Sequence, residues 1–122
     1  MIWLGERDAR PLLGGFDLFA ISSRKEGLPY VVLEAMAAGL PVVATASAGV
    51  ESLIEPGLNG QIVPTGDAPA FGSALIDLAS DCAQLAACGR ESLRRAALFT
   101  IDAMVERTLG LYLELQREAR RS

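Results

Sequence analysis

Apolar residues fall into two kinds of stretch along this chain. Short, nearly continuous apolar runs occupy residues 1–4, 17–21, 41–45 and 61–63, which is typical of parallel strands covered on both faces. Residues 30–38 are strong helix formers, and a glycine and a proline follow them as the usual end of a helix. The alternation of strands with helices predicts an α/β fold built on a parallel sheet.

Further helices are indicated around these strands. Residues 8–13 predict a short helix that two glycines end. Asp67 can cap another helix with one apolar face. That face consists of Phe71, Leu75 and Leu78. A helix is also expected over residues 82–98, and Thr100 can cap the last one. The apolar spacing of the last helix predicts that it packs in the core, with an exposed apolar face as the alternative.

Composition restricts the possible chemistry. The chain has 122 residues, of which 51% are apolar, and this fits one packed domain over residues 1–122. It contains no histidine, so carboxylates, hydroxyls and backbone groups must carry any acid–base chemistry. Cys82 and Cys88 have no histidine or second cysteine pair to complete a zinc site. We therefore expect no metal, and interpret them as core or helix-surface residues of a reduced, cytoplasmic chain.

Several functional classes are disfavoured. The net charge is −4, and residues 90–122 hold seven arginines against five acidic residues, too weak a field for nucleic acid. We expect Arg90, Arg94 and Arg95 to form a solvated face. The longest uncharged run, residues 35–50, falls short of the ~20 apolar residues of a membrane span, so no transmembrane segment is expected. No Gly-x-Gly-x-x-Gly or Gly-Lys-Ser/Thr motif occurs, which disfavours ordinary dinucleotide and P-loop enzymes.

Residues 23–39 are the most informative segment, because they join a strand to a helix through a loop. The amides of Tyr30, Val31 and Val32 belong to the first helical turn, where N–H groups lack intrahelical partners. Together with the helix dipole, these amides favour a bound phosphate. Gly27 allows a ligand to approach the backbone closely.

Two carboxylates flank these amides. Glu26 lies in the loop ahead of them, and Glu34 lies about one turn behind them in an otherwise apolar helix. An isolated carboxylate in such a helix is costly unless it has a partner. A ligand with hydroxyls at both ends and phosphates in the middle, such as a nucleotide-sugar, would suit this arrangement. On spacing alone, both glutamates could equally be solvated charges.

This segment resembles a known family. The sequence Glu26-Gly-Leu-Pro-x-Val-Val-Leu-Glu34-Ala-Met-Ala-Ala-Gly-Leu-Pro-Val-Val-Ala-Thr45 is similar to the Glu-x7-Glu signature of the retaining GT-B glycosyltransferases of family 4, also called glycosyl transferases group 1. Residues 2–5, 17–23, 55–64 and 99–100 match the family's pattern in the same order. The resemblance implies a Rossmann-like parallel sheet with flanking helices, corresponding to the later part of the C-terminal, donor-binding lobe.

The resemblance also implies roles for individual residues. Glu26 would contact hydroxyls of the donor sugar and is the candidate catalytic residue, whereas Glu34 would hold the ribose of the nucleotide. Donor-binding backbone amides would be those near Gly27, Leu28, Tyr30 and Val31. The implied reaction transfers a glycosyl group from a nucleotide-sugar to an acceptor with retention of configuration, without a metal or another cofactor.

Departures from the family pattern qualify these expectations. Pro29 lacks an N–H, and Ser52 stands where the family has a glutamate, with Glu51 one place early. The acceptor-binding lobe and the first strands of the donor lobe have no counterpart in this sequence. We therefore expect a donor-binding portion that is inactive alone and that pairs with the missing lobe or with a second chain.

Two alternatives concern assembly and class. Without the earlier strands, residues 17–21 would form an open sheet edge, which we expect residues 1–4 or a homodimer to cover. A non-catalytic nucleotide-binding or assembly module of the same fold remains possible as the function. A phosphoacceptor receiver domain needs an acidic pair after its first strand and a lysine late in the chain. This class is disfavoured because Lys25 is the only lysine.

Overall fold

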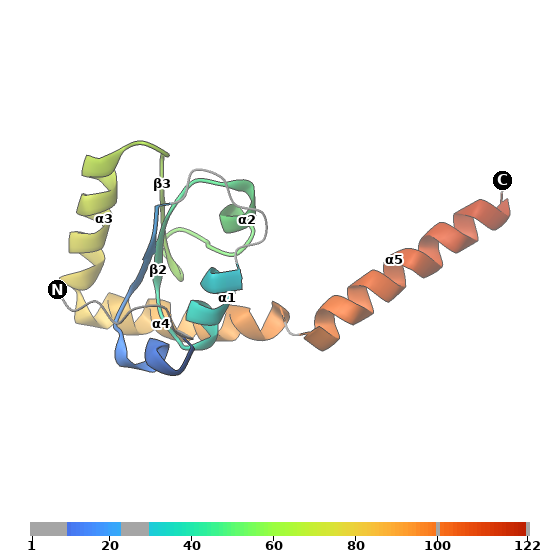
Figure 1. The fold of residues 1–122 in the computed structure, drawn as a ribbon, viewed down its shortest axis with the longest axis horizontal. Coiled ribbons are helices and arrows are strands. Elements are labelled where there is room, and N and C mark those ends of the chain that lie inside the picture. The colour runs from blue at the N-terminus through green and yellow to red at the C-terminus, as the bar shows by residue number, and fades with distance from the viewer. Residues whose placement is uncertain (1–9, 23–29, 100, 122) are drawn as a thin grey trace.

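The computed structural model describes residues 10–22, 30–99 and 101–121 (Figure 1). A sheet lies at the centre with helices on both faces, and the last helix extends away from this body. In chain order the elements are η1 (Arg10–Gly15), β1 (Phe19–Ile21), α1 (Tyr30–Ala37), β2 (Val42–Thr45), α2 (Ala48–Glu51), β3 (Gly60–Val63), α3 (Ala68–Ala79), α4 (Cys82–Ala96), η2 (Ala97–Phe99) and α5 (Ile101–Arg121).

The three strands are parallel and follow the order β1-β2-β3. Phe19 pairs with Val42, and Val42 pairs with Gly60. All four residues of the central strand β2 are buried, which explains its continuous apolar run. The predicted parallel α/β fold is therefore confirmed. β1 begins two residues later than expected, because the first ladder bond runs from the Phe19 amide to the Pro41 carbonyl at 3.0 Å.

The two faces of the sheet have different covers. Val42 and Ala44 pack with residues of α1 and α2 in one cluster, and Val43 packs with Leu78 of α3 and Cys88 of α4 in another. This division follows from the alternation of side chains along a strand. α1 and α3 therefore lie on opposite faces of the sheet.

Glycines allow two close approaches at the amino ends of the strands. A Cβ at Gly60 would overlap the carbonyl of Val42, and a Cβ at Gly89 would overlap the carbonyl of Gly39. The second contact lets α4 cross close to the end of α1. Gly39 ends α1 with a φ of 77°, a left-handed conformation that glycine adopts without steric cost.

Most predicted helices are confirmed. Asp67 caps α3 through its Oδ1, which accepts a hydrogen bond from the Ala70 amide at 3.0 Å. α4 ends at Ala96 and continues as the 3-10 turn η2. The predicted residue 8–13 helix was wrong in type and extent, since the described part is a 3-10 helix that runs through both glycines. The predicted strand at residues 1–4 and the cap at Thr100 lie outside the described residues.

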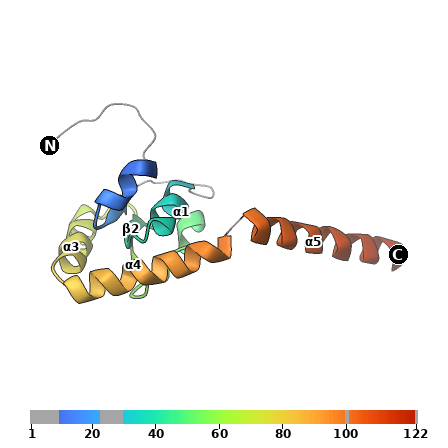
Figure 2. The ribbon, with the colours of Figure 1, turned by 90° about the horizontal axis from the view of Figure 1, so that it is seen from below.

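The prediction that the last helix packs in the core is wrong. α5 points away from the sheet in both views (Figures 1 and 2). The large apolar side chains exposed along it are Val105, Leu109, Leu111, Tyr112, Leu113 and Leu115. Because α1 with α2 and α3 with α4 already cover the two faces of the sheet, the body offers α5 no further sheet surface.

Candidate functional site

The first turn of α1 lies at the carboxyl edge of the sheet. β1 and β2 run parallel and end at this edge, and α1 begins there at Tyr30 after the connection from β1. Val32 is fully buried and fixes the helix against the sheet. Tyr30 is 66% exposed and Val31 is also exposed, so this turn faces solvent. Its amides are in the position where a helix start binds anions.

Glu34 follows Tyr30 by four residues, so the two side chains lie on the same side of α1. Glu34 is half-buried and lines a cavity of about 300 Å³ together with Leu13, Ala37 and Ala38. Glu34 therefore borders an open space, and the other residues that line it are apolar, as the sequence suggested. Tyr30, Val31 and Glu34 are thus brought together on one short helix. Glu26, Gly27 and Leu28 lie outside the described residues.

The loop after β2 contributes a polar group that sequence analysis did not identify. The Oγ of Ser47 is buried and has no hydrogen-bond partner among the described residues. Ser47 precedes α2, yet its side chain makes no capping hydrogen bond. Buried hydroxyls normally have partners, so this one is notable. The only sequence signal was its position, two residues after the buried strand β2.

Ser52, which stands at the family's glutamate position, is engaged locally. Its hydroxyl donates a hydrogen bond to the Gly49 carbonyl at 2.8 Å, within α2 and its last turn. Glu51, one place earlier, is exposed at the end of α2.

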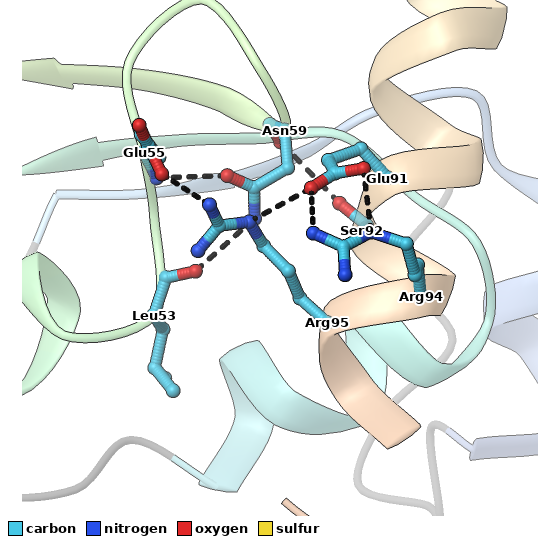
Figure 3. A network of polar contacts seen from close by, with 7 residues as sticks. All are labelled: Leu53, Glu55, Asn59, Glu91, Ser92, Arg94 and Arg95. Atoms are coloured by element: carbon cyan, nitrogen blue, oxygen red, sulfur yellow. Dashed lines mark hydrogen bonds and ion pairs between the residues drawn. The ribbon is translucent and has the colours of Figure 1, made fainter. Parts of the chain in front are cut away.

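The opposite, amino edge of the sheet holds a network of satisfied polar groups (Figure 3). Asn59 is fully buried just before β3. Its Oδ1 accepts a hydrogen bond from the Glu55 amide at 2.8 Å, and its Nδ2 donates to the Leu53 carbonyl at 3.1 Å. Ser92 of α4 donates to the Asn59 carbonyl at 3.3 Å. These bonds fix the turn before β3 and attach α4 to it.

The arginines of α4 differ from the predicted solvated face. Arg94 is solvated, with its side chain 62% exposed. Arg95 is only 19% exposed and pairs with both Glu55 and Glu91, so that prediction is wrong for Arg95. The reason is that Arg95 lies on the side of α4 that meets the turn before β3, where two carboxylates converge. The hydrogen bond from Arg94 is the main cause that lowers the pKa of Glu91, and the same pair raises the pKa of Arg94.

Cys88 is buried and Cys82 exposed, and both are free thiols, as interpreted from the sequence. Burial raises the pKa of the Cys88 thiol. Among the described residues, no three His, Cys, Asp or Glu side chains gather closely enough to hold a metal ion. No helix in the described part of the chain is both long and apolar enough to cross a membrane.

The family model of glycosyl transferases group 1 matches residues 1–81. The chain belongs to this family. The match includes the whole segment from Glu26 to Glu34 and all three strands of the sheet. The membership of the glycosyl transferases group 1 that the Glu-x7-Glu signature predicts is therefore confirmed.

Similarity to individual glycosyltransferases covers half of the chain or more. The lipopolysaccharide core biosynthesis glycosyltransferase LpsE of Rhizobium meliloti is 37% identical over 107 residues, which cover 85% of this chain and 31% of LpsE. The amylovoran biosynthesis glycosyltransferase AmsK of Erwinia amylovora is 43% identical over 61 residues, covering 50% of this chain and 15% of AmsK.

Two solved structures show the same fold. Sucrose-phosphate synthase of Thermosynechococcus elongatus matches with 31% identity and a TM-score of 0.72, over 82% of this chain and 26% of that one. Anabaena HepE in complex with UDP-glucose matches with 29% identity and a TM-score of 0.75, over 88% of this chain and 31% of HepE. The predicted Rossmann-like fold of a GT-B glycosyltransferase is therefore confirmed. The chain spans about a third or less of the length of these relatives.

Proposed function

We propose that this chain is the donor-binding portion of a retaining family 4 glycosyltransferase, which takes a glycosyl group from a nucleotide-sugar. The observation that supports this most directly is the position of α1. Its first turn and Glu34 lie together at the carboxyl edge of a parallel sheet, where ligands of such sheets bind. HepE, which matches this fold, has been crystallised with UDP-glucose.

In this proposal, each group at the edge has a separate task. The exposed amides of Tyr30 and Val31 receive the diphosphate, whose charge they stabilise as the glycosyl bond breaks. Glu34, at the border of the neighbouring cavity, accepts hydrogen bonds from the ribose hydroxyls. Glu26, with the amides near Gly27 and Leu28, contacts the donor sugar and is the catalytic residue by family resemblance.

The basic side chains of α4 do not belong to the proposed site. The arginines of α4 lie at the amino edge of the sheet, at the other edge from the first turn of α1. In this proposal the diphosphate is therefore bound by backbone amides. We propose that transfer requires an acceptor-binding lobe or a second chain, and that it needs no metal. We also propose that the protein is located in the cytoplasm, where reducing conditions keep its two thiols free.

The test is calorimetric titration of the 122-residue chain with UDP, GDP and ADP. We expect one of them to bind, and Glu34→Gln to weaken this binding by at least about tenfold, because the ribose loses a charged acceptor. Glu106→Gln, an equivalent change on the exposed surface of α5, is the matched control and should leave binding unchanged. A folded chain that binds none of the three nucleotides would contradict the proposal.

Transfer separates the enzyme from a non-catalytic module of the same fold. Both bind the nucleotide, but only the enzyme transfers sugar once an acceptor-binding lobe is supplied. Retention would be observed as the same anomeric configuration in donor and product by NMR. Glu26→Ala should abolish transfer more completely than it weakens binding of the bare nucleotide, because Glu26 is assigned to the sugar.

A further inference from the structure

The outer edge of β3 has no strand beside it among the described residues, because the order of the sheet is β1-β2-β3. Natural sheets often protect such an edge with charged side chains or proline. β3 consists of Gly60, Gln61, Ile62 and Val63, and none of these residues is charged or a proline. The residues of the strand therefore do not prevent a further strand from pairing with it.

The hydrogen bonds of the sheet show which backbone groups face this outer edge. The Asn59 carbonyl accepts a hydrogen bond from the Val42 amide at 3.1 Å, and the Val63 carbonyl accepts one from the Ala46 amide at 2.8 Å. In a parallel ladder, alternate residues direct their backbone groups to the same neighbouring strand. Ile62 therefore directs its N–H and its C=O away from β2.

Ile62 is the residue of β3 that offers both groups to an added strand. Gly60 has the same orientation, but its carbonyl already accepts a hydrogen bond from the Gly57 amide at 2.9 Å. An extended peptide that joins a sheet edge gains affinity from main-chain hydrogen bonds of this kind. The edge therefore offers such a peptide one donor and one acceptor.

A cavity of about 380 Å³ lies beside this edge, between β3 and α3. The core face of α3 contains Phe71 and Leu75, which pack with Val43 of β2. The cavity instead meets the neighbouring face of α3, on the side of β3. Its lining residues are Gln61, Val63, Ala70, Ser73, Ala74, Asp77, Leu78 and Gln84. A side chain of a strand added to β3 could enter this cavity on the α3 side of the sheet.

The charge of this region indicates the kind of partner. Four polar side chains of the cavity make no hydrogen bond within the described part of the chain: Gln61, Ser73, Asp77 and Gln84. Residues 60–89 contain two further aspartates, which cap helices, and no lysine or arginine. A basic side chain would therefore complement Asp77, whereas a second copy of this face would place one Asp77 against another.

We infer that the edge of β3 and this cavity together bind an extended peptide segment of a partner protein, with a lysine or arginine directed to Asp77. The segment lies beside β3 as a fourth strand and forms hydrogen bonds with both backbone groups of Ile62. The main-chain bonds give affinity, and the basic side chain gives specificity. The cavity shares no residue with the proposed nucleotide site, so this inference does not depend on the proposed function.

The test uses two blocked hexapeptides, Val-Thr-Val-Arg-Val-Thr and the same sequence with glutamate in place of arginine. Hydrogen exchange of the 15N-labelled chain is followed by NMR. The Ile62 amide should exchange faster than the amides of Gln61 and Val63, which face β2. Saturation with the arginine peptide should slow exchange at Ile62 by at least about tenfold, and the glutamate peptide should bind about tenfold more weakly.

A matched pair of charge reversals tests the role of Asp77. Asp77→Lys should weaken binding of the arginine peptide by about tenfold, because attraction becomes repulsion. Asp17→Lys is the control, since it makes the same change of charge at an exposed residue that lines another cavity, and it should leave binding unchanged. Equal effects of the two substitutions would show that Asp77 does not select the peptide.

Other outcomes would overturn the inference or separate it from the proposed function. A folded chain in which the arginine peptide does not slow exchange at Ile62 would contradict the added strand. Protection of Ile62 that rises with chain concentration in the absence of peptide would show that a second copy covers the edge instead. Nucleotide affinity should be the same for Asp77→Lys and the unmodified chain. Peptide binding by a chain that binds no nucleotide would support this inference and contradict the proposed function.

Discussion

The two edges of the sheet use their polar groups differently. At the amino edge, Asn59, Ser92 and Arg95 bond to backbone groups or to carboxylates of neighbouring elements. At the carboxyl edge, the first turn of α1 faces solvent, and Ser47 has a buried hydroxyl without a partner among the described residues. The cavity lined by Thr45 and Asp67 borders this edge as well.

This difference indicates which polar groups stabilise the fold and which are available to a ligand. Polar groups that satisfy one another hold elements in place and have little capacity left for a ligand. Groups that the fold positions but does not use can bind one. We therefore propose that the amino edge serves stability and that the carboxyl edge binds the ligand. Substitutions should divide in the same way.

Gly60→Ala should have the largest effect on stability. The new Cβ would overlap the Val42 carbonyl in the central strand, so the free energy of unfolding should fall by about 3 kcal/mol or more. Urea denaturation followed by circular dichroism measures this change. Gly110→Ala, in open space on α5, should instead stabilise by about 1 kcal/mol. Equal effects would contradict the close packing of β3 on β2.

Asn59→Ala should follow. It removes the partners of the Glu55 amide and the Leu53 carbonyl inside the protein, and an unsatisfied buried group costs about 1–3 kcal/mol. Ser52→Ala, which removes an exposed bond, is the matched control and should cost about 0.5 kcal/mol or less. Nucleotide affinity of the folded Asn59→Ala chain should equal that of the unmodified chain. A large loss of affinity would show that the amino edge also shapes the site.

Arg95→Met should cost about 1 kcal/mol, since an ion pair at a protein surface contributes little more. The Arg94→Met change should cost less, because Arg94 is far more exposed than Arg95. Thermal unfolding of both variants, at low and at high salt, measures this order. If Arg94→Met were the more destabilising change, the ion pair that joins α4 to the turn before β3 would not be the main stabilising contact of these arginines.

The smallest effect concerns pH. The folded pKa of Glu91 lies below its ordinary value of 4.5, mainly through the hydrogen bond from Arg94. The pair therefore stabilises the fold above pH 4.5, and this contribution is lost as the pH falls through the folded pKa. Stability measured by urea denaturation between neutral and acidic pH should decline less steeply for Glu91→Gln. An identical decline would show that the ion pairs of Glu91 do not contribute to the stability of the fold.

Much of the fold was predictable because its signals are local. The continuous apolar run of β2 and the cap at Asp67 each specify an element through neighbouring residues. The position of α5 was not predictable, because an apolar helical face gives no indication of whether a partner surface is free. η1 was also missed in type, since its local pattern does not distinguish a 3-10 turn from an α-helix.

The candidate site was predictable only in part. The Glu-x7-Glu spacing identified α1 and Glu34, whose helix the structure describes. The role of Arg95 depends on Glu55, forty residues away in sequence, and the orphan hydroxyl of Ser47 depends on what packs around it. The cavity beside Phe71 is formed by the ends of β1 and β2, the connection after β3 and the start of α3, which the sheet order brings together. Contacts between residues that are far apart in the sequence leave no recognisable pattern in a single sequence.

One measurement tests the division between the edges most directly. Amide NMR spectra of the 15N-labelled chain, titrated with the nucleotide selected by calorimetry, report where it binds. We predict shifts for Tyr30, Val31 and Glu34 at the carboxyl edge, and none for Asn59 or Arg95 at the amino edge. Shifts confined to the amino edge would contradict the account, since the nucleotide would then bind where the polar groups already satisfy one another.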